Sequence, residues 1–157
     1  MRNTISTFDK VCEMLEKIGF VPRILGNNHS IRVGLRNRLG LFDIAFCVEE
    51  EPSLLHMSIC LPLVVQDNSR VQIAELVVRI NNGWPFGHLD LDMSTGLLSV
   101  RGSIPVEDGE ITTGQFRYLL DGGMAMIDRY LLAIDRLILG ADLSPAEVIA
   151  EVEMAEA

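Results

Sequence analysis

A thiol and an imidazole are the first side chains in this sequence that could do chemistry together. Cys47 and His56 lie on two successive alternating segments, and pairing the apolar faces of these segments places them opposite each other. The same pairing places Cys60 opposite Asp43. A thiol beside an imidazole can become an activated nucleophile. A flat sheet face, however, offers neither oxyanion donors nor an enclosed pocket, so we favour simple cross-strand packing.

A second candidate set, His88, Asp90 and Asp92, alternates along one expected strand. Imidazole and carboxylate groups can ligate a divalent metal. Alternate residues on a strand are about 6–7 Å apart and their carboxylates splay along it, so we expect a solvated strand face and no metal. The sequence also has no glycine-rich phosphate loop and no Gly-x-Ser-x-Gly elbow, so we expect no cofactor and no enzymatic activity.

The composition is that of a globular protein and limits the classes of partner. Apolar residues make up 48% of the 157 residues and charged residues 22%, enough for the core of one domain spanning residues 1–157. The net charge is −9, although basic residues outnumber acidic ones by seven to three before residue 41. An acidic body repels nucleic acid and anionic membranes, so we expect neither as a partner.

Cysteine usage and the lengths of the apolar runs favour the cytoplasm. Cys12, Cys47 and Cys60 have no regular spacing, as is typical of free thiols in a reducing compartment. No apolar run approaches the ~20 residues that span a bilayer. The first residues lead into a charged amphipathic segment, and no apolar signal stretch is evident.

Two groups of residues are candidates for contact with a polypeptide partner. Arg32, Arg36 and Arg38 cluster on the first main strand and its turn, where they could dock an acidic segment. Trp84 and Phe86 flank a proline in a turn, and exposed aromatic rings often anchor partners. The alternatives are a solvated basic edge for the arginines and a cover over the end of the core for the two rings.

Gly122 and Gly123 lie in the middle of the longest expected helix. Each glycine costs about 1 kcal/mol there relative to alanine, so a close backbone approach is expected in return. We favour packing against the sheet. The alternative is the seam of a homodimer.

Apolar periodicity predicts the elements that position these residues. Period-three and period-four spacing predicts helices, and period-two alternation predicts strands. The helices are expected over residues 4 or 6 to 18, 67–82 and 112–139, with an acidic helix over 144–157; strands are expected over 30–36, 42–49, 55–61, 87–93 and 97–104. Thr112 with Gln115, and Ser144 with Glu147, are capping boxes. Residues 20–28 are interpreted as a connector ending in a turn.

The hairpin over residues 87–104 should align its apolar faces. This requires a two-residue Thr95-Gly96 turn or a four-residue loop around it. That register places Arg101 opposite Asp90.

The element order and three local segments resemble one known family. The segments are LVVRINN at 76–82, GHLDL at 87–91 followed by TGLLSVR at 95–101, and LGADLSPAEV at 139–148. Over essentially its whole length the chain resembles the YbjN-like domains, whose fold is that of type III secretion chaperones. The resemblance implies a helix, a three-stranded meander, a helix, a hairpin and a long helix. It also implies frequent dimerisation, a regulatory or partner-binding role, and no cofactor or reaction.

These observations predict an α+β protein with a five-stranded antiparallel sheet and helices on one face, in the order α-β-β-β-α-β-β-α-α. The predicted function is that of a non-enzymatic chaperone-like or regulatory adaptor. It is expected to be a cytoplasmic homodimer that binds an unidentified protein. The alternatives are a small-ligand-binding domain and a thiol-dependent enzyme using Cys47 and His56.

Overall fold

Eleven elements make up the described part of the chain. The computed structural model describes residues 6–26, 30–51, 53–106 and 110–155. In chain order the elements are α1 (Thr7–Lys17), β1 (Arg23–Leu25), β2 (Ser30–Asn37), β3 (Gly40–Glu50), β4 (Ser53–Val64), the short 3-10 helix η1 (Asp67–Ser69), α2 (Arg70–Gly83), β5 (His88–Leu91), β6 (Leu97–Pro105), α3 (Thr113–Ile138) and α4 (Pro145–Met154).

The sheet is antiparallel throughout, in the order β1-β2-β3-β4-β6-β5. It has six strands, so the prediction of five is wrong. The additional strand, β1, lies in the segment interpreted as a connector. All three of its residues are exposed, so β1 lacks the alternation of buried and exposed side chains by which the other strands are predicted. The segment is a strand because it pairs with β2, with Ile24 opposite Ile31.

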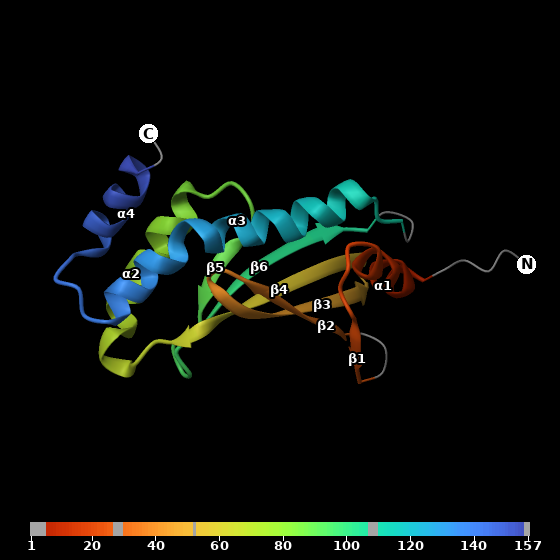
Figure 1. Cartoon of the computed structure of the whole chain (residues 1–157), viewed down its shortest axis with the longest axis horizontal. Coiled ribbons are helices and arrows are strands. Elements are labelled where there is room, and N and C mark those ends of the chain that lie inside the picture. Colours follow the sequence, from red (N-terminus) through yellow and green to blue (C-terminus); the bar gives the residue numbers. More distant parts are fainter. Residues whose placement is uncertain (1–5, 27–29, 52, 107–109, 156–157) are drawn as a thin grey trace, which may run out of the picture.

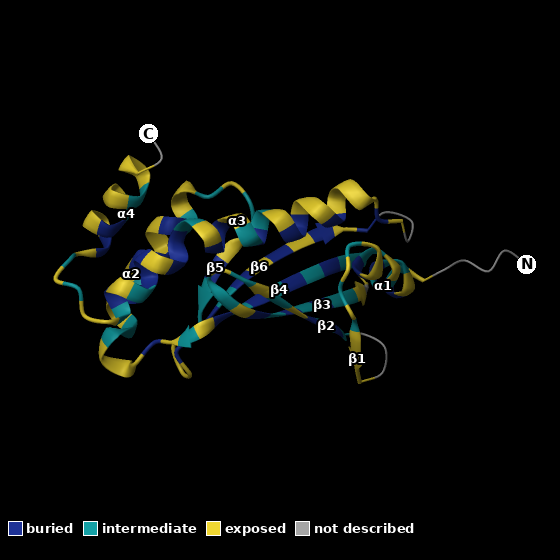
Figure 2. Cartoon of the chain, in the orientation of Figure 1, coloured by how far each residue is buried: buried dark blue, intermediate teal, exposed yellow. Residues whose placement is uncertain are grey.

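One face of the sheet is buried and carries the core. Side chains alternate between buried and partly exposed along β3 and β4, as the period-two pattern predicts. Figure 1 shows α3 running across this face, with α1 near one end and α2 near the other. Figure 2 shows the matching stripes of buried residues on the strands and on α3. Phe46 and Phe116 meet in the core with their ring centroids 5.4 Å apart.

The two predicted capping boxes, at Thr112 and Ser144, are both present, and Ser6 caps α1. The predicted helix over 67–82 differs at its start: residues 67–69 form the 3-10 helix η1, and Ser69 makes no side-chain capping hydrogen bond to α2. The alternative helix start at residue 4, the turn at 27–28 and the last two residues of the predicted 144–157 helix lie outside the described residues. Within the described part of the chain, no helix is long and apolar enough to cross a membrane.

The predicted register of the β5–β6 hairpin is wrong by two residues. Arg101 lies opposite His88, and Asp90 lies opposite Ser99. The reason is a five-residue loop, 92–96, closed by backbone hydrogen bonds from Asp92 N to Leu97 O at 2.9 Å and from Gly96 N to Asp92 O at 2.7 Å. Arg101 still reaches Asp90 diagonally, with 3.2 Å between Nε and Oδ2.

Candidate functional site

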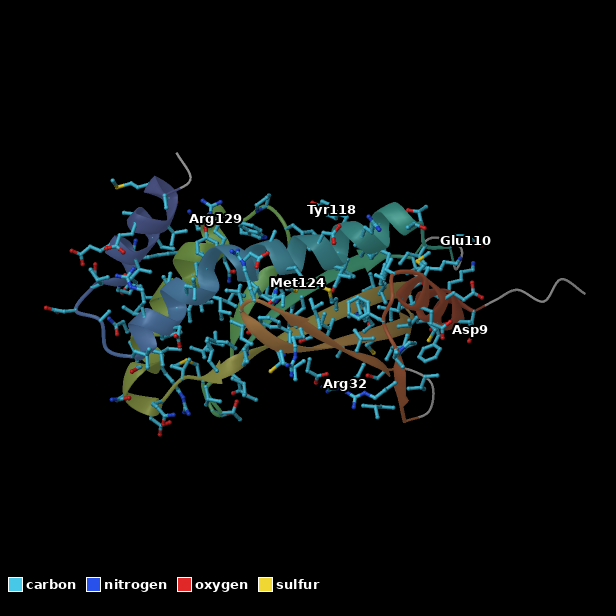
Figure 3. The ribbon with its side chains drawn as sticks, in the orientation of Figure 1. Asp9, Arg32, Glu110, Tyr118, Met124 and Arg129 are labelled. Atoms are coloured by element: carbon cyan, nitrogen blue, oxygen red, sulfur yellow. The ribbon has the colours of Figure 1, made fainter. Side chains whose placement is uncertain are left out.

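The face of the sheet opposite the helices is open. Figure 3 shows Arg32 on this side and Tyr118 on the other, where α3 lies. Across its middle, the register places a row of open-face residues side by side: Arg23, Arg32, Ala45, Ser58, Arg101 and His88. The small side chains of Ala45 and Ser58 therefore lie between Arg32 and Arg101.

Cys47 and His56 lie opposite each other, as the sequence predicts, and Cys60 lies opposite Asp43. The imidazole is engaged elsewhere: Nδ1 is 2.6 Å from Ser103 Oγ, and Nε2 is 3.2 Å from Glu49 Oε2. No hydrogen bond joins Cys47 to His56 among the described residues. The geometry thus gives no support to a nucleophile built from this thiol and this imidazole.

His88, Asp90 and Asp92 do not converge on a common point. Asp90 pairs with Arg101, while Asp92 accepts hydrogen bonds within its own loop from Ser94 N at 2.8 Å, Ser94 Oγ at 2.6 Å and Thr95 N at 3.3 Å. Within the described ranges no group of three or more His, Cys, Asp or Glu side chains could hold a metal ion.

Asp92 links the stability of the hairpin loop to pH. Hydrogen bonds from Ser94, followed by those from Thr95, hold the pKa of the Asp92 carboxyl well below its usual range. A depressed pKa in the folded state stabilises the protein above the unfolded-state pKa, and this stability is lost as the pH falls toward the folded-state pKa. We expect Asp92→Asn to lose less stability than the wild type between about pH 5 and pH 2. Urea unfolding at both pH values would measure the difference, and equal losses would contradict it.

The three predicted arginines occupy different environments. Arg32 forms an ion pair with Asp43 on the neighbouring strand, and both side chains are half-exposed. Arg36 and Arg38 are exposed, and neither has an ion-pair partner among the described residues. Arg36 and Arg38 are therefore the members of this cluster that remain available to an acidic partner.

Trp84 is partly buried against α3. Its ring meets Tyr130 edge-on at 6.0 Å between centroids, and the Arg129 guanidinium lies 5.9 Å from the indole centroid. Trp84 Nε1 is buried and has no hydrogen-bond partner among the described residues. The ring thus covers the end of the core. Whether it also contacts a partner stays a prediction.

Phe86 fills a niche formed by two glycines. A Cβ at Gly122 would lie 2.5 Å from Phe86 Cδ1, and one at Gly102 would lie 3.1 Å from Phe86 Cζ. The exposed ring of Tyr118 meets Phe86 edge-on at 4.5 Å. The space beside Gly122 is therefore filled by the Phe86 ring of the same chain. A role for Phe86 as a partner anchor stays a prediction.

Gly123 faces the sheet directly. A Cβ there would lie 2.6 Å from Met57 Cε and 2.9 Å from Ile59 Cδ1. Close approach to the sheet accounts for this glycine in the middle of a helix. A homodimer seam at Gly122 and Gly123 stays a prediction.

The edge of the sheet at β5 is closed by a side chain. Asn81 of α2 donates from Nδ2 to Leu89 O at 2.9 Å and accepts from Leu89 N at 2.8 Å. The single side-chain amide of Asn81 thereby pairs with both the backbone N–H and the backbone C=O of Leu89 on this edge strand. The sequence places Asn81 in an Asn-Asn-Gly helix end, but no sequence pattern indicates this long-range role.

The opposite edge, at β1, has no such cover among the described residues, and it exposes apolar side chains beside the cationic Arg23. Val21, Ile24 and Leu25 are 81%, 52% and 50% exposed, respectively, and Leu41 on β3 is exposed nearby. A hollow of about 490 Å³ beside β1 is lined by residues that include Leu25, Arg32 and Leu41. An uncovered strand with apolar side chains can pair with an added strand. We refer to β1, with Val21 and Leu41, as the β1 edge.

The element order and the strand order define an α+β domain with a six-stranded antiparallel sheet. Two solved structures show the same fold. YbjN, "a putative transcription regulator from E. coli", is 19% identical, with a TM-score of 0.62 over 81% of this chain and 90% of that one. The protein in the ExsC–ExsE complex structure is 17% identical, with a TM-score of 0.53 over 78% of this chain and 92% of that one.

The family model of YbjN, described as "Putative bacterial sensory transduction regulator", matches residues 7–136. The chain belongs to the YbjN family, as the sequence resemblance predicts, although the resembling segment at 139–148 lies outside the matched residues. No curated protein matches the sequence significantly.

Proposed function

We propose that this protein is a non-enzymatic adaptor, chaperone-like or regulatory, that binds an extended polypeptide segment along the β1 edge. Membership of a family described as regulatory supports the role, and so does the shared fold with a protein solved in a complex, ExsC–ExsE. The observation that carries the proposal is the difference between the two edges of the sheet. Asn81 caps one edge, while exposed apolar side chains surround the other.

The chemistry of the β1 edge specifies the segment that it receives. An added strand gains main-chain hydrogen bonds, and its alternate side chains reach the pockets beside the edge. Apolar residues of the segment would contact Ile24 and Leu25. Arg36 and Arg38 lie at and just beyond the end of β2, past its pairing with β1, and have no ion-pair partner among the described residues. Acidic residues farther along the segment would face them, and this contact would set the orientation of the segment.

We further propose that the protein acts as a homodimer through a different surface. Two β1 edges brought together would place like-charged arginines near each other, so the edge stays free for the partner. The measurement is the mass of the protein during size exclusion. A dimeric mass in both the wild type and the β1-edge variant described next is expected, and a monomer at all concentrations would contradict the dimer.

A charge placed on the β1 edge should weaken partner binding and leave the fold intact. Ile24→Lys introduces an ammonium group where an apolar contact is expected, and Val71→Lys is the matched control at a 76% exposed valine of α2. Tagged wild type and both variants would be used to capture partners from the native cytosol, with quantitative mass spectrometry. We expect at least a tenfold loss of one stoichiometric partner for Ile24→Lys, a cost of about 1.4 kcal/mol or more.

The Val71→Lys variant should capture that partner as the wild type does. Circular dichroism would check that both variants remain folded. Equal capture by all three proteins would show that the β1 edge is not the binding surface. Capture of no stoichiometric protein by the wild type would contradict the adaptor role itself.

A further inference from the structure

The short helix α4 is seated on α2 and α3 and makes few contacts elsewhere. Pro145 and Val148 are buried in this seat, and Ile149 and Val152 pack partly against the core. Figure 1 shows α4 beside α2 at the end of the molecule far from β1. We call the surface of α2 and α3 beneath α4 the α4 seat.

Two polar contacts at the rim fix the orientation of α4. Arg136 Nη1 of α3 is 2.8 Å from Glu151 Oε2, and Gln72 Nε2 of α2 donates to Leu143 O at 3.2 Å. The side chains of Arg136 and Glu151 are 54% and 48% exposed. Exposed ion pairs of this kind contribute little to stability, but they select charge and direction.

Several features of α4 are those expected of an element that opens locally before the rest of the fold. The family model ends at residue 136, so α4 lies outside the matched region. The helix has ten residues, of which two are buried. It is joined to α3 by the non-helical residues 139–144, where Gly140 has φ +86°. Elements with few buried apolar contacts open at a fraction of the global unfolding free energy.

We propose that the α4 seat is a second binding site, which takes an acidic amphipathic helix of a partner polypeptide when α4 moves away. This inference rests on the proposed role in binding a polypeptide, although it concerns a surface remote from the β1 edge. A helix seated in an apolar groove is a recurrent mode of peptide recognition. In the absence of a partner, α4 of the same chain fills this groove.

The side chains of α4 define the chemistry of the competing helix. Val148 and Val152 are four residues apart, so they lie on one face of the helix. Glu151 stands at the position that meets Arg136. The partner helix should therefore carry apolar residues at i and i+4 and a carboxylate at i+3. A helix with a cation at i+3 should bind more weakly, because it would lie beside Arg136.

Because α4 is covalently joined to α3, it competes with any partner helix at a high effective concentration and keeps the α4 seat filled. The apparent affinity of a free helix is reduced by the fraction of molecules in which the seat is open. Weakening α4 should raise that fraction. The same substitution placed in the free helix should abolish its binding.

The experiment uses the full chain and a fluorescein-labelled peptide of residues 142–157 as the probe, with binding followed by fluorescence anisotropy. Val148→Asp in the chain places a carboxylate in the buried contact of α4 and releases it. We expect this variant to bind the peptide at least tenfold more tightly than the wild type does. The peptide carrying Val148→Asp should bind to neither chain.

Charge reversal tests the predicted chemistry of the site. Adding Arg136→Glu to the Val148→Asp chain should weaken peptide binding about two- to fivefold, as expected for an exposed ion pair. The Glu151→Arg peptide should recover that loss. A folded Val148→Asp chain that does not bind the peptide would overturn the proposal, as would binding that is indifferent to Val148→Asp in the peptide.

If Val148→Asp unfolds the whole chain, native-state hydrogen exchange of the wild type decides. We expect the amides of α4 to exchange faster than those of α3. Exchange of both helices only through global unfolding would overturn the proposal. None of these measurements involves Ile24, so a failure at the β1 edge and a failure at the α4 seat are distinguishable.

Discussion

Gly123→Leu should destabilise the fold more than any other substitution considered for this protein. The new side chain would extend from a Cβ that already lies 2.6 Å from Met57 Cε and 2.9 Å from Ile59 Cδ1. These atoms belong to side chains that are almost completely buried, so they have little room to move aside. We expect a loss of about 3 kcal/mol or more in the free energy of unfolding, because overpacking displaces α3 from the sheet.

Ala125→Leu is the matched control, since Ala125 is exposed on the same helix. For a chain of this size, 3 kcal/mol corresponds to roughly 6–12 °C in Tm. Thermal unfolding followed by circular dichroism would measure both variants. A Gly123→Leu chain that is folded and monomeric, beside a dimeric wild type, would instead assign this glycine to the homodimer seam.

Asn81→Ala should also be costly, because one amide caps the β5 edge. Its removal leaves Leu89 N and Leu89 O without the bonds of 2.8 Å and 2.9 Å that Asn81 provides, at a residue that is 2% exposed. Losing partners of partly buried backbone groups costs about 2 kcal/mol. We also expect the uncapped strand to promote association at high protein concentration.

Two further substitutions sharpen this expectation. Asn82→Ala changes the exposed neighbouring residue and should leave the free energy of unfolding nearly unchanged. Asn81→Asp keeps an acceptor for Leu89 N but removes the donor to Leu89 O. In urea unfolding, Asn82→Ala should therefore have a higher free energy of unfolding than either Asn81 variant. Equal stability of Asn81→Ala and Asn82→Ala would show that the cap is unimportant.

Local signals in the sequence predict much of this fold. The capping boxes at Thr112 and Ser144 involve residues three positions apart, so the start of each helix is encoded locally. The β3–β4 connection is short, which leaves few registers that keep both apolar faces buried. The facing of Cys47 and His56 follows from that constraint.

Features that depend on distant residues could not be predicted in the same way. β1 has three exposed residues and is a strand only through its pairing with β2. The β5–β6 register depends on a loop held by the Asp92 side chain. Arg70 of α2 also binds this loop, donating to Met93 O and Ser94 O at 3.0 and 3.2 Å. Neither contact leaves a periodic pattern in the sequence.

The candidate site shows the same division between local and distant information. The arginine cluster is visible in the sequence, but the pairing of Arg32 with Asp43, which leaves Arg36 and Arg38 available, depends on the register of two strands. The exposed residues of β1 and the capping role of Asn81 emerge only when both edges of the sheet are placed. The proposed binding surface therefore follows from tertiary structure.

Hydrogen–deuterium exchange of the complex between this protein and its captured partner would test the central claim most directly. If the partner adds a strand to the β1 edge, amides in residues 23–25 should gain protection on binding, because new main-chain hydrogen bonds form there. The amide of Leu89 in β5, which Asn81 already caps, should show no change. Unchanged exchange of β1 in a complex that is otherwise fully formed would contradict the account.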